Sequence, residues 1–223
     1  MKSIRRSGTF ALSDIFIYTF PYYVVPWAFG LGAPIIILEA TFRIFRGASV
    51  IYTAACDLAI PGQTRALAAR DASRLIRTTL LAAALCCVPA AFVCLLLMFG
   101  SKQLFAFLLG AAATVPPAVS PILIVMVLAN NLVQMVAQSL LLHAGFFREI
   151  SRIGASVAIA MIAATAISVV AKLNIVEFLA VYTAVYTAGA LYLVVAAYRG
   201  PIRAASPHQA PNLKPAAQTV AAH

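Results

Sequence analysis

The sequence predicts an all-α integral membrane protein, a six-helix bundle with both chain ends on the cytoplasmic side. Of its 223 residues, 63% are hydrophobic and only 10% are charged, whereas soluble domains carry about 25% charged residues. The mean hydropathy is +0.97. The apolar segments are long and continuous, which disfavours a closed β-barrel, because barrel strands alternate in hydrophobicity over about ten residues. We therefore expect the chain to lie in a membrane.

Six segments are long and apolar enough to be spans, because a helix needs about 20 mostly apolar residues to cross the hydrocarbon core. They are residues 10–31, 34–60, 75–99, 119–144, 153–171 and 175–198. Pro61 and Gly62 suit a helix interior poorly and are expected to end the second span. Residues 63–77 then form either a short amphipathic helix on the cytoplasmic surface or a basic loop. Residues 1–199 make up the bundle, and the proline- and alanine-rich residues 200–223 are expected to be a disordered tail.

The basic residues test this arrangement of spans. With the amino terminus inside, the cytoplasmic segments hold twelve of the 16 Lys and Arg residues: Lys2, Arg5, Arg6, Arg65, Arg70, Arg74, Arg77, Arg148, Arg152, Arg199, Arg203 and Lys214. The external loops hold only Lys102 and Lys172. This bias follows the positive-inside rule. The net charge of +10 is therefore first a topology signal, and a multi-pass membrane protein is expected.

A polar stripe runs along one face of the second span. On a wheel of 100° per residue, its members fall within about 80° of one another. They are Glu39, Arg43, Arg46, Val50, Thr53 and Asp57. A charge near the bilayer centre costs about 3 kcal/mol or more unless it is paired or wetted, so such residues usually face a bundle interior or a polar cavity. The stripe indicates that the protein handles something polar inside a membrane.

Two interpretations of the charges in this stripe remain open. Glu39 and Arg43 stand four residues apart and can form an ion pair that merely ties two helices together. Alternatively, Arg43 and Arg46 form a cationic patch for an anionic substrate group, and Glu39 and Asp57 tune it. Arginine suits phosphate because its planar fork donates two parallel hydrogen bonds. At least one of the two cations must find a partner elsewhere, a water or a ligand.

The other polar positions lie in the first and fourth spans. Four amides of the fourth span share a face within about 100°: Asn130, Asn131, Gln134 and Gln138. They suit sugar hydroxyls, since an amide both donates and accepts, and they equally suit hydrogen bonds between helices. Asp14 in the first span is either an ion-coupling carboxylate or a neighbour of Arg5 or Arg6 near the cytoplasmic end.

The sequence contains no catalytic constellation. It has no glycine-rich phosphate loop, no nucleophile elbow and no histidine-rich metal set. The four cysteines all fall within expected spans and show no metal-ligand spacing. We therefore expect no enzyme activity, no metal, no cofactor and no nucleic-acid partner.

Three stretches carry a resemblance to a known family. They are ATFRIFRG at residues 40–47, ALAARDASRLIRTTLLAAALCCVPAAFVCLLLMFGSKQLFAFLLG at 66–110 and NNLVQMVAQSLLLHAGFFREISRIG at 130–154. Together these resemble the second half of the lipid-linked oligosaccharide (O-antigen type) flippases of the multidrug/oligosaccharidyl-lipid/polysaccharide exporter superfamily. In that family a basic segment leads into a span with a mid-helix proline, here Pro89. A short outer motif follows, here residues 99–110.

The resemblance implies a carrier that flips a polyprenyl-diphosphate-linked saccharide across the bacterial inner (cytoplasmic) membrane by alternating access. Family members enclose a central, often cationic cavity between two bundles, and this chain has only one. The chain is thus expected to be either a half-carrier that needs a second bundle, from a homodimer or a separate chain, or a truncated fragment of such a carrier. Two alternatives remain: a non-transporting membrane subunit of a polysaccharide synthesis or export complex, and a drug or small-molecule exporter of the same superfamily. The family's drug exporters usually keep acidic sites, which the arginines of the second span disfavour.

Overall fold

The computed structural model describes residues 2–110, 114–142 and 144–202, with side chains described from Leu12 onward apart from those of Asp14, Gln138 and Ser139. The described chain is helical almost throughout and contains no strand, so the all-α prediction is confirmed there. The helices, in chain order, are α1 (Lys2–Phe29), α2 (Ala33–Ala68), α3 (Ala72–Phe99), α4 (Ser101–Leu109), α5 (Val119–Val133), the π-helix η1 (Gln134–Leu141), α6 (Phe147–Val170), α7 (Ile175–Ala197) and the π-helix η2 (Tyr198–Ile202).

Four helices are long and apolar enough, by length and composition, to cross a membrane. They are α3, α5 continued into η1, α6, and α7 continued into η2. In α1 the described apolar part, Ile15–Phe29, is shorter, and α2 carries the charged residues of the stripe. The four helices support a membrane protein, and the count of six spans stays a prediction.

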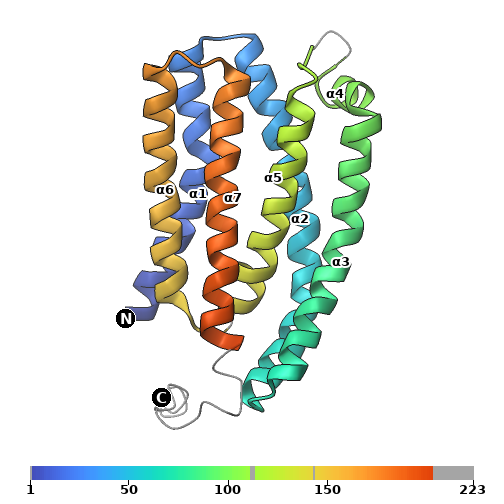
Figure 1. The fold of residues 1–223 in the computed structure, drawn as a ribbon, viewed down its shortest axis with the longest axis vertical. Coiled ribbons are helices and arrows are strands. Elements are labelled where there is room, and N and C mark those ends of the chain that lie inside the picture. Colours follow the sequence, from blue (N-terminus) through green and yellow to red (C-terminus); the bar gives the residue numbers. More distant parts are fainter. Residues whose placement is uncertain (1, 111–113, 143, 203–223) are drawn as a thin grey trace.

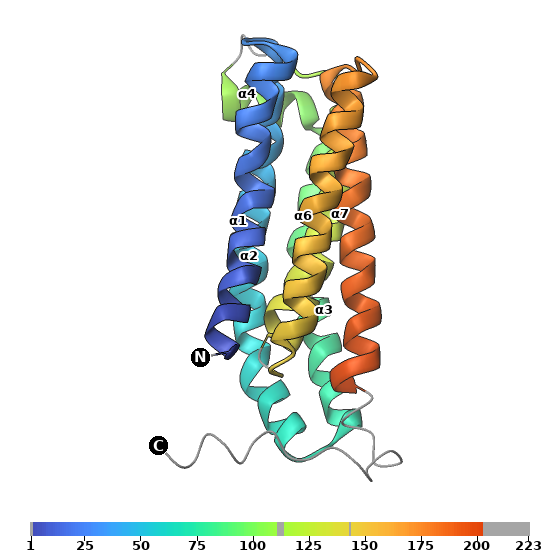
Figure 2. The ribbon, with the colours of Figure 1, turned by 90° about the vertical axis from the view of Figure 1, so that its left-hand side faces the viewer.

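The long helices α1, α2, α3, α5, α6 and α7 run side by side along the long axis of the molecule (Figure 1, Figure 2). Helix α6 packs against α1 and α7, α2 packs against α3, and the contacts of α5 with α7 and of α1 with α2 join these groups. Aromatic rings fill the junction between α2 and α7, where Phe42 and Phe45 are fully buried. The ring of Phe42 lies 6.0 Å from Tyr182 and that of Phe45 lies 5.5 Å from Tyr186, both edge-on. Such edge-to-face pairs add to the stability that burial alone provides.

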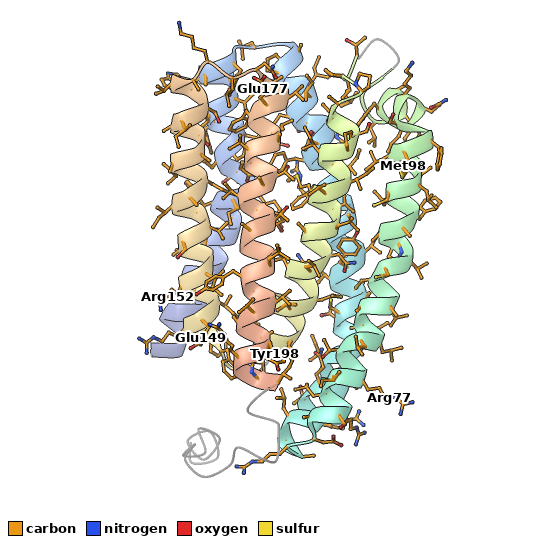
Figure 3. The ribbon with its side chains drawn as sticks, in the orientation of Figure 1. Arg77, Met98, Glu149, Arg152, Glu177 and Tyr198 are labelled. Carbon is orange, nitrogen blue, oxygen red and sulfur yellow. The ribbon has the colours of Figure 1, made fainter. Side chains whose placement is uncertain are left out.

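The turns alternate between the two ends of the bundle. The start of α1, the α2–α3 turn, the start of α6 and the end of α7 lie at one end (Figure 1). Arg77 and Arg152 are at this end, and Glu177 is at the other (Figure 3). The structure therefore gathers the predicted cytoplasmic segments, as far as they are described, at a single end. Which side of the membrane this end faces remains a prediction from the charge bias.

Helix α2 does not end at Pro61 and Gly62 as the sequence indicated, and residues 63–77 form no separate helix. The helix continues to Ala68, and after a short turn α3 begins at Ala72. The reason is packing between α2 and α3. The buried Gln63 donates from Nε2 to Thr79 Oγ1 at 3.1 Å, and a Cβ at Gly62 would come within 3.1 Å of the Thr78 methyl group. These tertiary contacts outweigh the hydrogen bond that a proline removes.

Two other predicted boundaries also shift. The fourth span was expected to be one helix over 119–144, but it changes from α-helix to the π-helix η1 at Gln134. The predicted tail was expected to begin at residue 200, but Tyr198–Ile202 is a π-helix, in which Gly200 packs closely against the ring of Phe146. The remainder of the predicted tail, residues 203–223, lies outside the described residues.

Candidate functional site on the flank of helix α2

The charged members of the polar stripe lie on the outside of the bundle. The side chains of Arg43 and Arg46 are 50% and 55% exposed, and Glu39 is 30% exposed. On other faces of α2, Phe42 and Phe45 are fully buried against the neighbouring helices. The sequence led us to expect charges that face a bundle interior or a polar cavity, but the structure places them on a flank. Helix α2 is amphipathic in this sense: its aromatic residues face the core, and its charges face outward.

A compact cluster joins this flank to helix α1. The hydroxyl of Tyr22 donates to Glu39 Oε2 at 2.8 Å and accepts from Arg46 Nη2 at 2.7 Å. The second carboxylate oxygen of Glu39 accepts from Arg43 Nε at 3.1 Å, which confirms the ion pair expected from the four-residue spacing. Arg46 also lies 3.7 Å from Glu39 Oε2, with its guanidinium carbon 5.6 Å from the centre of the Tyr22 ring. One carboxylate therefore serves two cations, and the cluster keeps one net positive charge.

Arg43 extends the cluster to a third helix. Its Nη1 donates to the carbonyl oxygen of Leu108 in α4 at 2.7 Å. Helix α4 lies at the end of the bundle that carries the α1–α2 and α6–α7 turns (Figure 1). The cluster thus lies toward this predicted outer end. The hydrogen bonds of Tyr22 link it to α1, and the hydrogen bond from Arg43 to Leu108 links it to α4. Both interpretations of the charges stay open, because these contacts use only part of the hydrogen-bonding capacity of the half-exposed guanidinium groups.

An open groove lies next to the cluster. It is lined on one side by Tyr18, Thr19, Tyr22 and Tyr23 of α1 and on the other by Glu39 and Arg46 of α2, and its volume is about 390 Å³. A second hollow, lined by residues of α1, α5, α6 and α7, is much smaller, about 30 Å³, and its walls are almost entirely apolar. Of these two hollows, the groove on the flank is the one with charged side chains in its walls.

The lower part of the stripe continues the exposed face. Val50, Thr53 and Asp57 are all exposed. Thr53 donates to Gln134 Oε1 at 3.3 Å and to its own helix at Ser49. Among the described side chains, no cation lies within ion-pair distance of the Asp57 carboxylate. Asp57 is therefore an exposed acid on the flank of a helix bundle.

The amides of α5 and η1 do not share this flank. Asn130 is fully buried and donates to Ser49 Oγ of α2 at 2.7 Å, and it accepts from the Tyr186 hydroxyl of α7 at 3.3 Å. Gln134 is buried and accepts from Thr53. Of the two interpretations of these amides, the contacts of Asn130 and Gln134 favour hydrogen bonds between helices. Asn131 is also buried, and its side-chain oxygen has no partner among the described residues.

Two predicted site residues cannot be placed. The side chains of Asp14 and Gln138 lie outside the described part of the chain. Conversely, two residues that complete the polar contacts, Tyr22 and Ser49, were not predicted as site residues. Tyr22 was one of several aromatic residues in an apolar segment, and Ser49 lies outside the polar stripe of α2.

In the described ranges, no three His, Cys, Asp or Glu side chains come together as a set that could hold a metal ion. No family model matches the sequence, and neither a curated protein nor a solved structure is significantly similar to it.

Proposed function

We propose that this chain is one bundle of a carrier that moves a polyprenyl-diphosphate-linked saccharide across the bacterial inner membrane by alternating access. The observation that carries the proposal is the cation cluster on the flank of α2, where Arg43 and Arg46 share the single carboxylate of Glu39. A diphosphate supplies the missing negative charge, and the free guanidinium donors match its oxygens.

The surroundings of the cluster fit a lipid-linked ligand. The groove opens on the side of the bundle, so a ligand with a long apolar tail reaches it from the lipid without crossing the core. Tyrosine side chains along the groove combine an apolar ring with a polar hydroxyl, which suits a ligand that joins a lipid to a sugar. Asn130 and Gln134 hold the helices together and are no longer needed as sugar ligands in this proposal.

The same observations require a second bundle. A charge that faces the hydrocarbon core is costly unless protein or water covers it. The hollow between α1, α5, α6 and α7 is small and apolar, so in this proposal the transport path lies between the charged flank and another bundle. A second candidate, a non-transporting membrane subunit of a polysaccharide synthesis or export complex, is favoured by the position of the charged cluster on the flank, where a partner protein could also cover it.

The test is the export of the saccharide in cells that depend on this chain. Arg43→Gln with Arg46→Gln should abolish export while the protein accumulates normally in the membrane. Arg43→Lys with Arg46→Lys should retain part of the activity, because lysine keeps the charge but not the bidentate fork. The double variant Arg65→Gln with Arg77→Gln, which removes the same charge far from the groove, serves as the control. Normal export by the Arg43→Gln, Arg46→Gln variant would rule out the proposed site.

Native mass spectrometry of the chain in nanodiscs, with lipids retained, separates the two candidates. A carrier bundle should retain a polyprenyl-diphosphate lipid, and the Arg43→Gln, Arg46→Gln variant should lose it. A subunit with no transport role should bind no such lipid, and the same substitutions should instead weaken its assembly with the complex.

A further inference from the structure

The two arginines of the cluster differ in how closely they meet the shared carboxylate. Arg43 donates from Nε directly to Glu39 Oε1 at 3.1 Å. Arg46 Nη2 lies 3.7 Å from Glu39 Oε2, which is longer than a direct hydrogen bond. Of the two arginines, Arg46 is the one that lines the groove beside the cluster. The cation that faces the groove is therefore the one that is paired less closely with Glu39.

The hydroxyl of Tyr22 bridges Arg46 and Glu39. It accepts from Arg46 Nη2 at 2.7 Å and donates to Glu39 Oε2 at 2.8 Å. Hydrogen bonds with a charged partner are stronger than those between neutral groups. The same nitrogen and the same carboxylate oxygen form the 3.7 Å pair. One hydroxyl thus satisfies both charged atoms without a direct hydrogen bond between them.

The aromatic core fixes the ring that carries this hydroxyl. The centre of the Tyr22 ring lies 5.6 Å from that of Phe42, which is fully buried. The backbone carbonyl of Phe42 accepts from Arg46 Nε at 3.2 Å, and the Arg46 guanidinium carbon lies 5.6 Å from the centre of the Tyr22 ring, a cation–π distance. Tyr22 and Phe42 therefore hold the guanidinium group in place. Its other N–H donors have no acceptor among the described residues.

We propose that Tyr22 is a positioning residue of the anion site: its hydroxyl prevents a direct ion pair between Glu39 and Arg46 and so leaves Arg46 able to bind a phosphate-class anion in the groove. Without the hydroxyl, Glu39 Oε2 loses its donor while Arg46 lies only 3.7 Å away. The two groups then close into a direct pair, which takes up N–H donors that the ligand needs. The inference rests on the proposed function, because it assumes that the ligand is an anion. It assigns Arg46 as the principal contact of that anion and Arg43 as the counter-charge of Glu39.

Binding of farnesyl diphosphate to the full chain, in nanodiscs of phosphatidylcholine, tests this. The matched ligand is farnesol, which has the same apolar chain and no anionic group. The ratio of the two dissociation constants therefore measures recognition of the diphosphate alone. Tyr22→Phe removes the hydroxyl and keeps the ring that packs against Phe42. The control variant is Tyr192→Phe, which removes a hydroxyl from an exposed side chain of α7.

Tyr22→Phe should weaken the binding of farnesyl diphosphate about tenfold and leave the binding of farnesol unchanged. In the Glu39→Gln background, where no carboxylate competes for Arg46, the same substitution should change the affinity for the diphosphate by less than about twofold. A tyrosine that only shaped the groove would affect both ligands and both backgrounds. Equal losses for the two ligands, or equal losses with and without Glu39, would therefore overturn the inference.

The unsubstituted chain separates this inference from the proposed function. If it binds farnesyl diphosphate no better than farnesol, the groove is not an anion site, and both the proposed site and the role of Tyr22 are rejected. If it prefers the diphosphate and Tyr22→Phe retains that preference, the proposed site stands and only the role of Tyr22 is rejected.

Discussion

Ser49 and the two arginines of α2 lie on different sides of the helix. Ser49 turns inward and hydrogen-bonds to the fully buried Asn130 of α5. Arg43 and Arg46 turn outward and remain half exposed. Neutral polar groups inside a bundle can satisfy each other with one or two hydrogen bonds. Two guanidinium groups and one carboxylate, by contrast, leave one positive charge that is not balanced within the cluster. The inner contacts therefore hold the bundle together, and the flank keeps binding capacity for another molecule.

The same contrast appears between two glycines. A Cβ at Gly189 of α7 would come within 2.5 Å of a Val157 methyl group of α6, whereas a Cβ at Gly47 on the flank of α2 would meet nothing within 4 Å. Small residues allow membrane helices to approach closely, so Gly189 is required by packing. Among the residues that the structure describes, none would contact a side chain at Gly47, so no packing contact seen here requires a glycine at this position.

Gly189→Leu is expected to have the largest effect on stability. The side chain must displace Val157, which is β-branched and stiff, and we expect a loss of about 3 kcal/mol in the free energy of unfolding. Gly47→Leu is the matched control and should change that free energy by less than about 0.5 kcal/mol. Reversible unfolding in mixed micelles measures both. Equal losses at the two sites would contradict the assignment of an inner and an outer face.

Asn130→Leu should have the next largest effect. It removes the acceptor of the Tyr186 hydroxyl and the donor to Ser49, and we expect the free energy of unfolding to fall by about 1–2 kcal/mol. The double-mutant cycle of Asn130→Leu with Tyr186→Phe should show coupling, since both substitutions remove the same hydrogen bond. Additive effects would mean that the two side chains do not interact.

Hydropathy and charge spacing were enough to predict the all-α fold and the Glu39–Arg43 ion pair, because both depend on local periodicity. The end of α2 was predicted wrongly, because the packing of Gln63 and Gly62 against α3 is a tertiary contact that local rules at Pro61 do not include. The direction of the stripe also could not be obtained from a helical wheel. A wheel groups side chains on a face but does not say which face the neighbouring helices cover.

The contacts of the amides also could not be predicted from a helical wheel. The wheel places four amides on one face of the fourth span, but it does not show that Ser49 and Tyr186, from two other helices, hydrogen-bond to Asn130. Nor does the sequence show that Tyr22 stands between Glu39 and Arg46. These hydrogen-bond partners are 17 to 81 residues apart in the sequence. They can be identified only from the packing of the helices in the structure.

Arg43→Gln is expected to have the smallest effect of the three substitutions on stability, although it lies in the proposed binding site. Its contact with the Leu108 carbonyl holds the end of α4, and a half-exposed charged contact contributes about 1 kcal/mol or less. The loss should therefore appear locally, as faster hydrogen exchange of α4 amides, with little change in global unfolding. Arg46→Gln is the control, since Arg46 bonds to Tyr22 and Phe42 and not to α4. Of the two arginines, Arg43 is the one that contacts α4. Equal protection of the α4 amides from exchange in both variants would therefore show that apolar contacts hold this helix. Arg43 could then bind an anion without loosening α4.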